Sequence, residues 1–173
     1  MADKITINPA KINDSEIISD LATKTFFDTY ENKLNPKDMD TYTKNNFNAE
    51  SISNEIKNKT AWYFLIYENN KPIGYSKLKW GKAPDRFNGF RPLEIDKLYL
   101  IRGKQNIGLG AIAMEKIKTL AKKHGYNIIW LRVWEHNKKA LNFYKKLGFV
   151  EMENIDFKFA GKILNDYLLA INI

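Results

Sequence analysis

Residues 93–110 read Leu93-Glu94-Ile95-Asp96-Lys97-Leu98-Tyr99-Leu100-Ile101-Arg102-Gly103-Lys104-Gln105-Asn106-Ile107-Gly108-Leu109-Gly110. The residue pattern predicts a strand up to Ile101, and helical spacing of apolar residues predicts a helix from Gly108 to Lys123. A polar turn joins them, and Gly108 and Gly110 lie in the first helical turn. Such a helix start leaves backbone N–H groups free at the positive end of the helix dipole, where glycine lets an anion approach closely. The stretch is therefore a candidate cradle for a pyrophosphate.

Two other phosphate-binding motifs fit the sequence less well. Residues 108–113 match G-x-G-x-x-A, the fingerprint of dinucleotide-binding folds, and Glu135 ends the following strand. In those folds the first glycine follows its strand at once and a long parallel sheet comes next. Here a turn of about six residues intervenes and the remaining chain is short, so we reject that interpretation. The string G-x-x-x-x-G-K-[ST] does not occur, which excludes a P-loop nucleotidase.

The flanking sequence predicts one α+β domain with a mixed sheet. Before the decisive stretch, patterns and turn residues predict a strand at 4–8, helices starting near 13, 35 and 49, a hairpin of strands 62–67 and 72–78, and a loop at 81–91. After it, they predict a strand at 128–134, a helix at 137–147, and closing strands at 149–159 and 163–171. No internal repeat or linker interrupts residues 1–173, so we expect a single domain.

Composition narrows the class of protein. With 173 residues and 44% hydrophobic residues the chain can fill one sizeable core, and its mean hydropathy of −0.47 excludes a membrane-embedded protein. The absence of cysteine removes disulfides, zinc ribbons and thiol nucleophiles, and His124 and His136 are too few for a metal site, so we expect no metal. Without a membrane span or a secretory leader, the expected location is the cytoplasm.

Charge is distributed unevenly along the chain. The net charge is +8, but residues 1–50 carry six lysines and nine acids, for a net −3. Residues 51–173 carry 22 Lys/Arg and 11 acids, for a net +11. This pattern fits ordinary solvated surfaces as well as it fits a binding site for an anionic partner. A second, independent observation is needed to favour the anionic partner.

Two motifs together resemble the GNAT acyltransferases. Gln105-x-x-Gly108-x-Gly110 is similar to that family's Q/R-x-x-G-x-G/A acyl-CoA pyrophosphate loop. Residues 137–149 resemble its later N-x-x-A-x-x-F-Y-x-x-x-G-F signature, about 30 residues downstream with a strand between. The resemblance runs from about Tyr63 to the C-terminus. It implies a central mixed, mostly antiparallel sheet of about six to seven strands flanked by helices.

Three further segments resemble a narrower group, the bacterial polyamine N-acetyltransferases of the PaiA type. They are residues 25–30, 93–99 and 133–137. This resemblance implies transfer of an acetyl group from acetyl-CoA to a primary amine, with spermidine or spermine as the expected acceptor. The helices at about 13–58 would then form the substrate side, and residues 93–150 the acetyl-CoA-binding core.

The resemblance also implies roles for individual residues. The pantetheine arm would pair with backbone at Leu98, Tyr99 and Leu100, whose N–H groups could also hold the thioester oxygen as it becomes an oxyanion. The pyrophosphate would bind residues Gln105, Asn106, Ile107, Gly108, Leu109 and Gly110. Asn137 and Lys146 would touch the cofactor, although Asn137 is also a natural helix N-cap and Lys146 a natural solvated lysine.

Acid–base chemistry needs two further groups. A leaving thiolate has an ordinary pKa of about 8.5, and a tyrosine hydroxyl at about 10 can return a proton to it. Tyr144 matches the family's general acid; spacing alone also suits a core aromatic. An attacking amine with a pKa of about 10.4 must lose a proton first. Glu94 is the first candidate base, with Asp96 on the same strand face and Glu135 as a third candidate, while an ordinary strand carboxylate is the alternative for Glu94.

Acceptor binding is expected on the N-terminal helices. Phe26 and Tyr30, with Tyr42, could line the methylene chain of a polyamine, and Glu94 and Asp96 could meet its ammonium groups. Acids on the same helices, namely Asp28, Glu31, Asp38 and Asp40, would suit a cationic amine. Each aromatic residue is equally at home in ordinary packing.

The sequence therefore predicts an acetyl-CoA-dependent N-acetyltransferase that works by direct transfer, since no cysteine can carry an acyl group. The alternatives are an acetyltransferase for protein N-termini or another small amine and, more remotely, a non-catalytic basic module that binds nucleic acid. We expect acetyl-CoA and a small amine as partners, neither nucleic acid nor membrane, and leave a homodimer open.

Overall fold

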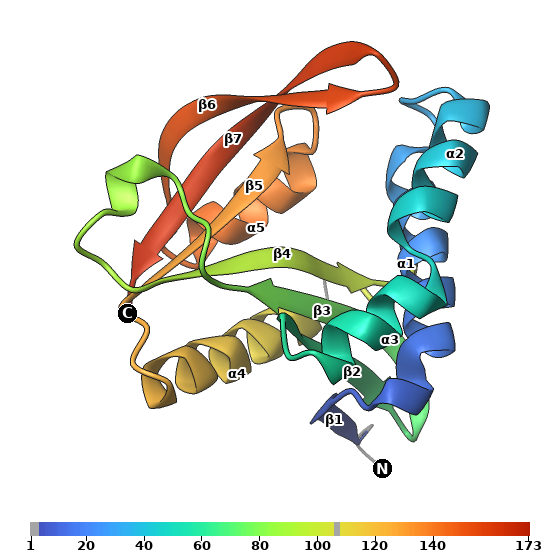
Figure 1. The fold of residues 1–173 in the computed structure, drawn as a ribbon, viewed down its shortest axis with the longest axis horizontal. Helices are drawn as coiled ribbons and strands as arrows, with labels where there is room; N and C mark the ends of the chain where they lie inside the picture. The colour runs from blue at the N-terminus through green and yellow to red at the C-terminus, as the bar shows by residue number, and fades with distance from the viewer. Residues whose placement is uncertain (1–3, 106–107) are drawn as a thin grey trace. The chain divides into compact units, whose positions relative to one another are not determined.

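The computed structural model describes residues 4–105 and 108–173 (Figure 1). The strands are β1 (Ile5–Pro9), β2 (Ala61–Glu68), β3 (Lys71–Lys79), β4 (Pro92–Leu100), β5 (Ile128–Trp134), β6 (Val150–Phe159) and β7 (Lys162–Asn172). The α-helices are α1 (Ser15–Tyr30), α2 (Pro36–Asn46), α3 (Ala49–Lys57), α4 (Leu109–Lys123) and α5 (Lys138–Lys146). Short 3₁₀ turns lie at Ile12–Asp14 and Asp85–Phe87. None of the described helices is long and apolar enough to cross a membrane.

The predicted α+β class is confirmed. The seven strands form one sheet in the order β1-β2-β3-β4-β5-β7-β6. Strands β4 and β5 pair in parallel, from Pro92↔Ile128 to Glu94↔Trp130. The pairs β1–β2, β2–β3, β5–β7 and β6–β7 are antiparallel, so the sheet is mixed and mostly antiparallel.

The chain divides into two compact units, which we describe separately. The first comprises the chain up to Lys79 together with Lys97–Met114, and the second comprises Trp80–Asp96 with Glu115–Ile173. Strand β4 and helix α4 each contribute to both. The expectation of a single domain stays a prediction.

In the first unit, strand alternation separates two apolar layers. Tyr63, Leu65 and Tyr75 face one side, where they pack with Ile18 and Leu21 of α1 in a buried cluster. On the other side Ile66 packs with Leu100 of β4 and Leu109 of α4. Ile73 joins this cluster at a register irregularity of the hairpin, because the pairing passes from Gly74 opposite Ile66 to Pro72 opposite Tyr67 and skips Ile73. Each fully buried side chain of this size stabilises the fold by roughly 1.5–3 kcal/mol.

Asparagine side chains start two of the first unit's helices. The side chain of Asn35 accepts a hydrogen bond from Lys37 N at 2.9 Å, with Pro36 in the first turn of α2. The side chain of Asn48 accepts from Ser51 N at 2.8 Å at the start of α3. These caps satisfy N–H groups that have no carbonyl partner in the first turn, and they explain why both helix starts are readable from sequence.

In the second unit, the long β6–β7 hairpin pairs with β5 through β7 (Figure 1). Trp130, Leu168 and Ala170 form a buried cluster on one face, which Phe87 of the 3₁₀ turn covers at a ring distance of 5.9 Å from Trp130. Strand β6 ends the strand order, and a register irregularity lies between Glu151 and Glu153.

Hydrogen bonds of one glutamate connect α3 to the β2–β3 hairpin of the first unit. Glu55 of α3 accepts a hydrogen bond from the Tyr63 hydroxyl at 2.5 Å and another from Lys77 Nζ at 2.9 Å. Lys77 also lies over the Tyr63 ring, with Nζ 5.3 Å from the ring centre. The lysine side chain is only 14% exposed, so this carboxylate stabilises its ammonium group more than it would stabilise that of a surface lysine.

We therefore predict that Glu55→Ala lowers the free energy of unfolding by about 2 kcal/mol, because it removes a carboxylate that accepts hydrogen bonds from the mostly buried Lys77 ammonium and from the Tyr63 hydroxyl. Urea unfolding measures the change. The matched control is Asp40→Ala, which breaks the exposed Asp40–Lys44 pair and should cost less than about 1 kcal/mol. Equal losses in the two variants would contradict the prediction.

Candidate active site

The turn between β4 and α4, residues 101–108, is the predicted cofactor loop. Lys104 N donates to Ile101 O at 3.1 Å, and Gln105 Nε2 folds back to Leu100 O at 3.2 Å. Gly103 and Gly108 have φ angles of +87° and +85°, a region that glycine adopts without the penalty that a side chain brings. Asn106 and Ile107, both predicted to bind pyrophosphate, lie outside the described residues.

Helix α4 begins immediately after Gly108. The carbonyl of Gly108 accepts from Ala111 N at 3.0 Å and from Ile112 N at 3.2 Å, which starts the helical ladder. Gly110 lies in the first turn, and a Cβ atom at Gly108 would meet nothing within 4 Å. The first N–H groups of a helix have no carbonyl partner within the helix, so this end can receive an anion. The predicted strand–turn–helix geometry is thus present.

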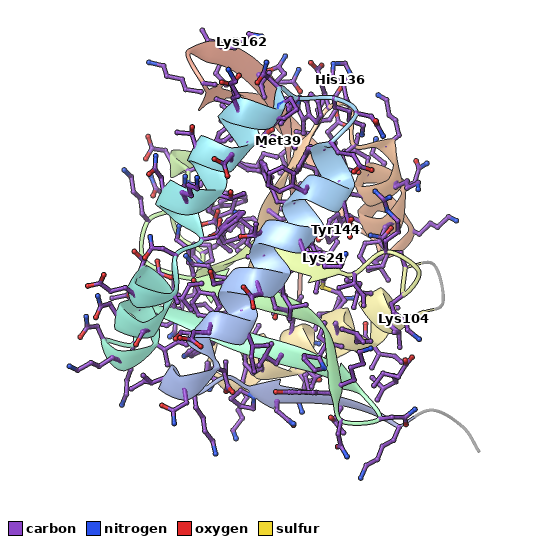
Figure 2. All side chains as sticks on the ribbon, turned by 90° about the vertical axis from the view of Figure 1, so that its right-hand side faces the viewer. Lys24, Met39, Lys104, His136, Tyr144 and Lys162 are labelled. Carbon is purple, nitrogen blue, oxygen red and sulfur yellow. The ribbon has the colours of Figure 1, made fainter. Side chains whose placement is uncertain are left out.

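The two cations of the cofactor loop are already paired. Arg102 Nη2 lies 2.5 Å from Glu31 Oε1 and 3.1 Å from Asp28 O. Lys104, which is labelled in Figure 2, has its Nζ atom 2.5 Å from Glu68 Oε2. The hydrogen bond that Arg102 donates to Glu31, followed by the charges of Glu31 and Asp28, raises the pKa of Arg102 above its ordinary value. Carboxylates of the first unit therefore offset both positive charges beside the predicted pyrophosphate site.

Strand β4 is held tightly from the side of β3. A Cβ atom built on Gly74 would lie 2.7 Å from Leu100 Cδ2 and closer still to Tyr99 O. Beside this contact, Ile101 N donates to Ile73 O at 2.9 Å. Sequence reasoning missed this residue, although a lone glycine inside a strand is a known signal of close backbone approach.

The predicted acceptor aromatics gather beside this strand. Phe26 lies 4.8 Å from Tyr30 and stacks on Tyr42 at 5.0 Å between ring centres. The Tyr30 hydroxyl lies 3.5 Å from the Tyr99 hydroxyl, and Tyr99 stacks on Tyr75 at 6.2 Å. The first unit therefore brings Phe26 and Tyr30 together with the end of β4, where Leu98, Tyr99 and Leu100 lie.

The acids of the N-terminal helices have partners within the first unit. Lys24 Nζ lies 3.4 Å from Asp28 Oδ2, and Arg102 NH2 lies 3.7 Å from Asp28 Oδ1 (Figure 2). Oδ2 is buried and, among the described atoms, has no hydrogen-bond partner beyond this ion pair. Asp40 pairs with Lys44 at 2.7 Å. Much of the expected attraction for a cationic amine is therefore cancelled locally.

The candidate bases lie in the second unit. Glu94 is 8% exposed and sits opposite Trp130 in the parallel register, so the two side chains share a sheet face. Asp96 is half-buried on the same face of β4. Glu135 is paired with His136 at 3.7 Å, and that histidine is largely exposed (Figure 2). Burial of a carboxylate makes Glu94 the most unusual of the three.

Helix α5 carries the remaining predicted residues. The Asn137 side chain accepts from Ala140 N at 3.3 Å, which confirms its prediction as the N-cap. Tyr144 is 7% exposed and packs its ring against Phe143 at 5.0 Å and Phe149 at 5.4 Å (Figure 2). Lys146 is exposed. Tyr144 therefore has the packing of a core aromatic on the buried face of α5.

No group of three or more His, Asp or Glu side chains that could hold a metal ion occurs in the part of the chain that the structure describes. The predicted site residues thus fall into two sets, one in each unit. The first unit holds the cofactor loop, the aromatic residues and the end of β4. The second holds Glu94, Asp96, Asn137, Tyr144 and Lys146.

Known proteins share both the sequence and the fold. Residues 18–149 match the model of the acetyltransferase (GNAT) family. An uncharacterized N-acetyltransferase of Lactobacillus delbrueckii subsp. lactis is 28% identical over 149 residues, 86% of each chain. The crystal structure of PaiA N-acetyltransferase from Thermoplasma acidophilum with coenzyme A superposes with a TM-score of 0.80 at 20% identity, over 98% of this chain and 99% of that one. The structure of a putative acetyltransferase from Salmonella typhimurium with its cofactor acetyl-CoA superposes with a TM-score of 0.69 at 15% identity, over 98% of this chain and 94% of that one.

We predict that Gly74→Ala lowers acetyl-transfer kcat/KM about tenfold or more, because the added methyl group must push β4 away at Tyr99 and Leu100. Steady-state thiol release measures this loss. Gly161→Ala is the control: φ there is +76° and nothing lies within 4 Å, so alanine is strained without crowding a neighbour. Equal activity losses in the two variants would remove the special role of the β3–β4 contact.

Proposed function

Because the chain belongs to the acetyltransferase (GNAT) family and is an N-acetyltransferase with acetyl-CoA as co-substrate, we propose that it acetylates a small primary amine of the polyamine class. The proposed binding of acetyl-CoA is supported mainly by the geometry of the cofactor loop. Gly108 opens α4 in a conformation suited to glycine, and Gln105 folds back onto Leu100. This leaves the N-terminus of α4 to receive the pyrophosphate.

The proposed binding residues follow the chain. Backbone groups of Leu98, Tyr99 and Leu100 hold the pantetheine arm, and the loop and helix start, residues 105–110, hold the pyrophosphate. Asn137 and Lys146 touch the cofactor from α5. Acetyl-CoA supplies an acetyl group activated as a thioester.

The proposed reaction is direct transfer. Glu94, directly or through water, accepts a proton from the substrate ammonium, and the neutral amine nitrogen bonds to the acetyl carbonyl carbon. N–H groups of β4 hold the oxygen as negative charge develops there. The carbon–sulfur bond then breaks, and Tyr144 donates its hydroxyl proton to the departing thiolate. The products are the N-acetylated amine and free coenzyme A, and solvent re-protonates the tyrosine.

Three observations support the polyamine class. The aromatic side chains of Phe26 and Tyr30 lie beside Tyr99 at the end of β4, where they suit a flexible methylene chain. Glu94 and Asp96 share one face of β4 and suit ammonium groups. The narrower sequence resemblance also points to polyamine acetyltransferases. Glu94 and Asp96 are the proposed contacts for the ammonium groups of the amine.

The substrate is tested by thiol release from acetyl-CoA with spermidine, spermine, short diamines, amino acids, an aminoglycoside and a peptide with a free N-terminus. We expect kcat/KM to be highest for spermidine or spermine. Highest activity on the peptide would transfer the assignment to a protein N-terminal acetyltransferase. Thiol release from none of the amines, with nucleic-acid binding that weakens steeply with salt, would favour the basic-module alternative.

Tyr144→Phe should lower kcat on the best amine about 100-fold or more, because it removes the proposed proton donor while keeping the ring that packs on Phe149. Coenzyme A affinity, measured by calorimetry, should stay within about twofold, since the ring packing persists. The matched control is Tyr126→Phe, another partly buried tyrosine of the second unit, which lies by Arg91. Unchanged kcat in Tyr144→Phe would leave Tyr144 a packing residue only.

The base is tested through pH. Glu94→Gln should lower kcat/KM for the amine about 100-fold near pH 7, where an amine of pKa about 10.4 is almost entirely protonated. The deficit should shrink as the pH approaches 10, because the neutral amine becomes abundant without a base. Glu151→Gln removes an exposed carboxylate of the same unit and serves as control. A deficit that stays constant with pH would assign Glu94 to packing or binding instead.

A further inference from the structure

We propose that Arg102 is a positioning residue that couples the last turn of α1 to the cofactor loop, so that coenzyme A binding is transmitted to the acceptor side. This inference rests on the proposed function, because that function places the acceptor beside α1 and the cofactor at the loop. Every contact that carries it lies within the first unit.

Arg102 makes three contacts with one turn of α1. Its NH2 group donates to Asp28 O at 3.1 Å and to Glu31 Oε1 at 2.5 Å, and lies 3.7 Å from Asp28 Oδ1. These partners are 74 and 71 positions away in sequence. One guanidinium nitrogen thus joins a main-chain carbonyl and two carboxylates at the end of α1, in hydrogen bonds strengthened by its charge.

The contact with Asp28 O has a specific physical meaning. The last carbonyls of an α-helix have no N–H partner within the helix, and the C-terminal end carries partial negative charge. Asp28 lies in the final turn of α1, which ends at Tyr30. Arg102 therefore caps α1 with a cation that belongs to the cofactor loop, and the helix end and the loop cannot move independently while the contact persists.

On the loop side, Arg102 is embedded in a tight turn. It follows Ile101, whose N–H is bound to Ile73 O, and precedes Gly103 with φ of +87°. Two residues later, Lys104 is paired with Glu68 of β2 at 2.5 Å. Because the backbone on both sides is constrained, a shift of the loop on binding an anion is carried by Arg102 to α1.

Because Arg102 is exposed, its proposed coupling role can be tested separately from its effect on the stability of the fold. Its side chain is 60% exposed, and ion pairs at such positions contribute little to the free energy of unfolding. Removing the guanidinium should therefore leave the fold intact. A variant that folds normally but loses the coupling is the expected outcome.

The experiment is amide hydrogen exchange with and without coenzyme A, which needs no knowledge of the amine. In the wild-type chain, coenzyme A should slow exchange about fivefold or more in peptides covering residues 98–105 and also in peptides covering 28–34. In Arg102→Ala, protection should remain at 98–105 and be lost at 28–34. The double variant Arg102→Glu with Glu31→Arg restores an opposite-charge pair and should recover part of the response.

Arg86→Ala is the matched control, because Arg86 also pairs with an exposed glutamate, Glu153, at 3.4 Å but belongs to the second unit. It should leave both responses unchanged. Protection of 98–105 without protection of 28–34 in the wild type, or protection of both in Arg102→Ala, would overturn the inference while leaving the function intact. No protection at 98–105 in the wild type would overturn the cofactor assignment and the coupling together.

Discussion

Strand β3 approaches β4 so closely at Gly74 that no side chain fits between the glycine and the backbone at Tyr99 and Leu100. This contact fixes the end of β4 in the first unit. The cofactor loop follows directly, and the Tyr99 ring that meets Tyr30 belongs to the same segment. The start of the cofactor loop and the position of the Tyr99 ring therefore depend on one steric constraint between two strands. A site that must align a thioester with an amine to a fraction of an ångström benefits from such a rigid support.

Local signals made most of the secondary structure predictable. Strand β5 occupies Ile128–Trp134 as expected, because a short run that is apolar except at Arg132 and rich in β-branched and aromatic residues favours a buried strand. The starts of α2 and α5 could be predicted because their signals are local. Asn35 and Asn137 cap N–H groups two or three residues ahead, and Pro36 lies in the first turn of α2. The two family motifs are local in the same sense: the glycines of the first lie at the start of α4, and the second covers α5.

Contacts between distant segments were not predictable in this way. The closeness of Gly74 to β4 depends on strand order and register, which a single sequence does not encode locally. The partners of Arg102 and Lys104 lie far away in the chain, so the distribution of charge along the sequence does not reveal these ion pairs. The roles of Glu94 and Tyr144 stay predictions, since burial and packing suit a structural side chain as well as an acid or a base.

The far end of the sheet has a different consequence. Strand β6 ends the strand order with Val150, Met152 and the neighbouring Ile163 exposed, a combination that invites strands of other molecules to add to the sheet. Glu151, Glu153 and Asp156 interrupt the apolar residues along β6, and the register irregularity at 151–153 bends the strand away from ideal pairing. Charged side chains at such positions oppose the addition of a further strand, because a new strand would place their carboxylates beside its own side chains and strip them of water.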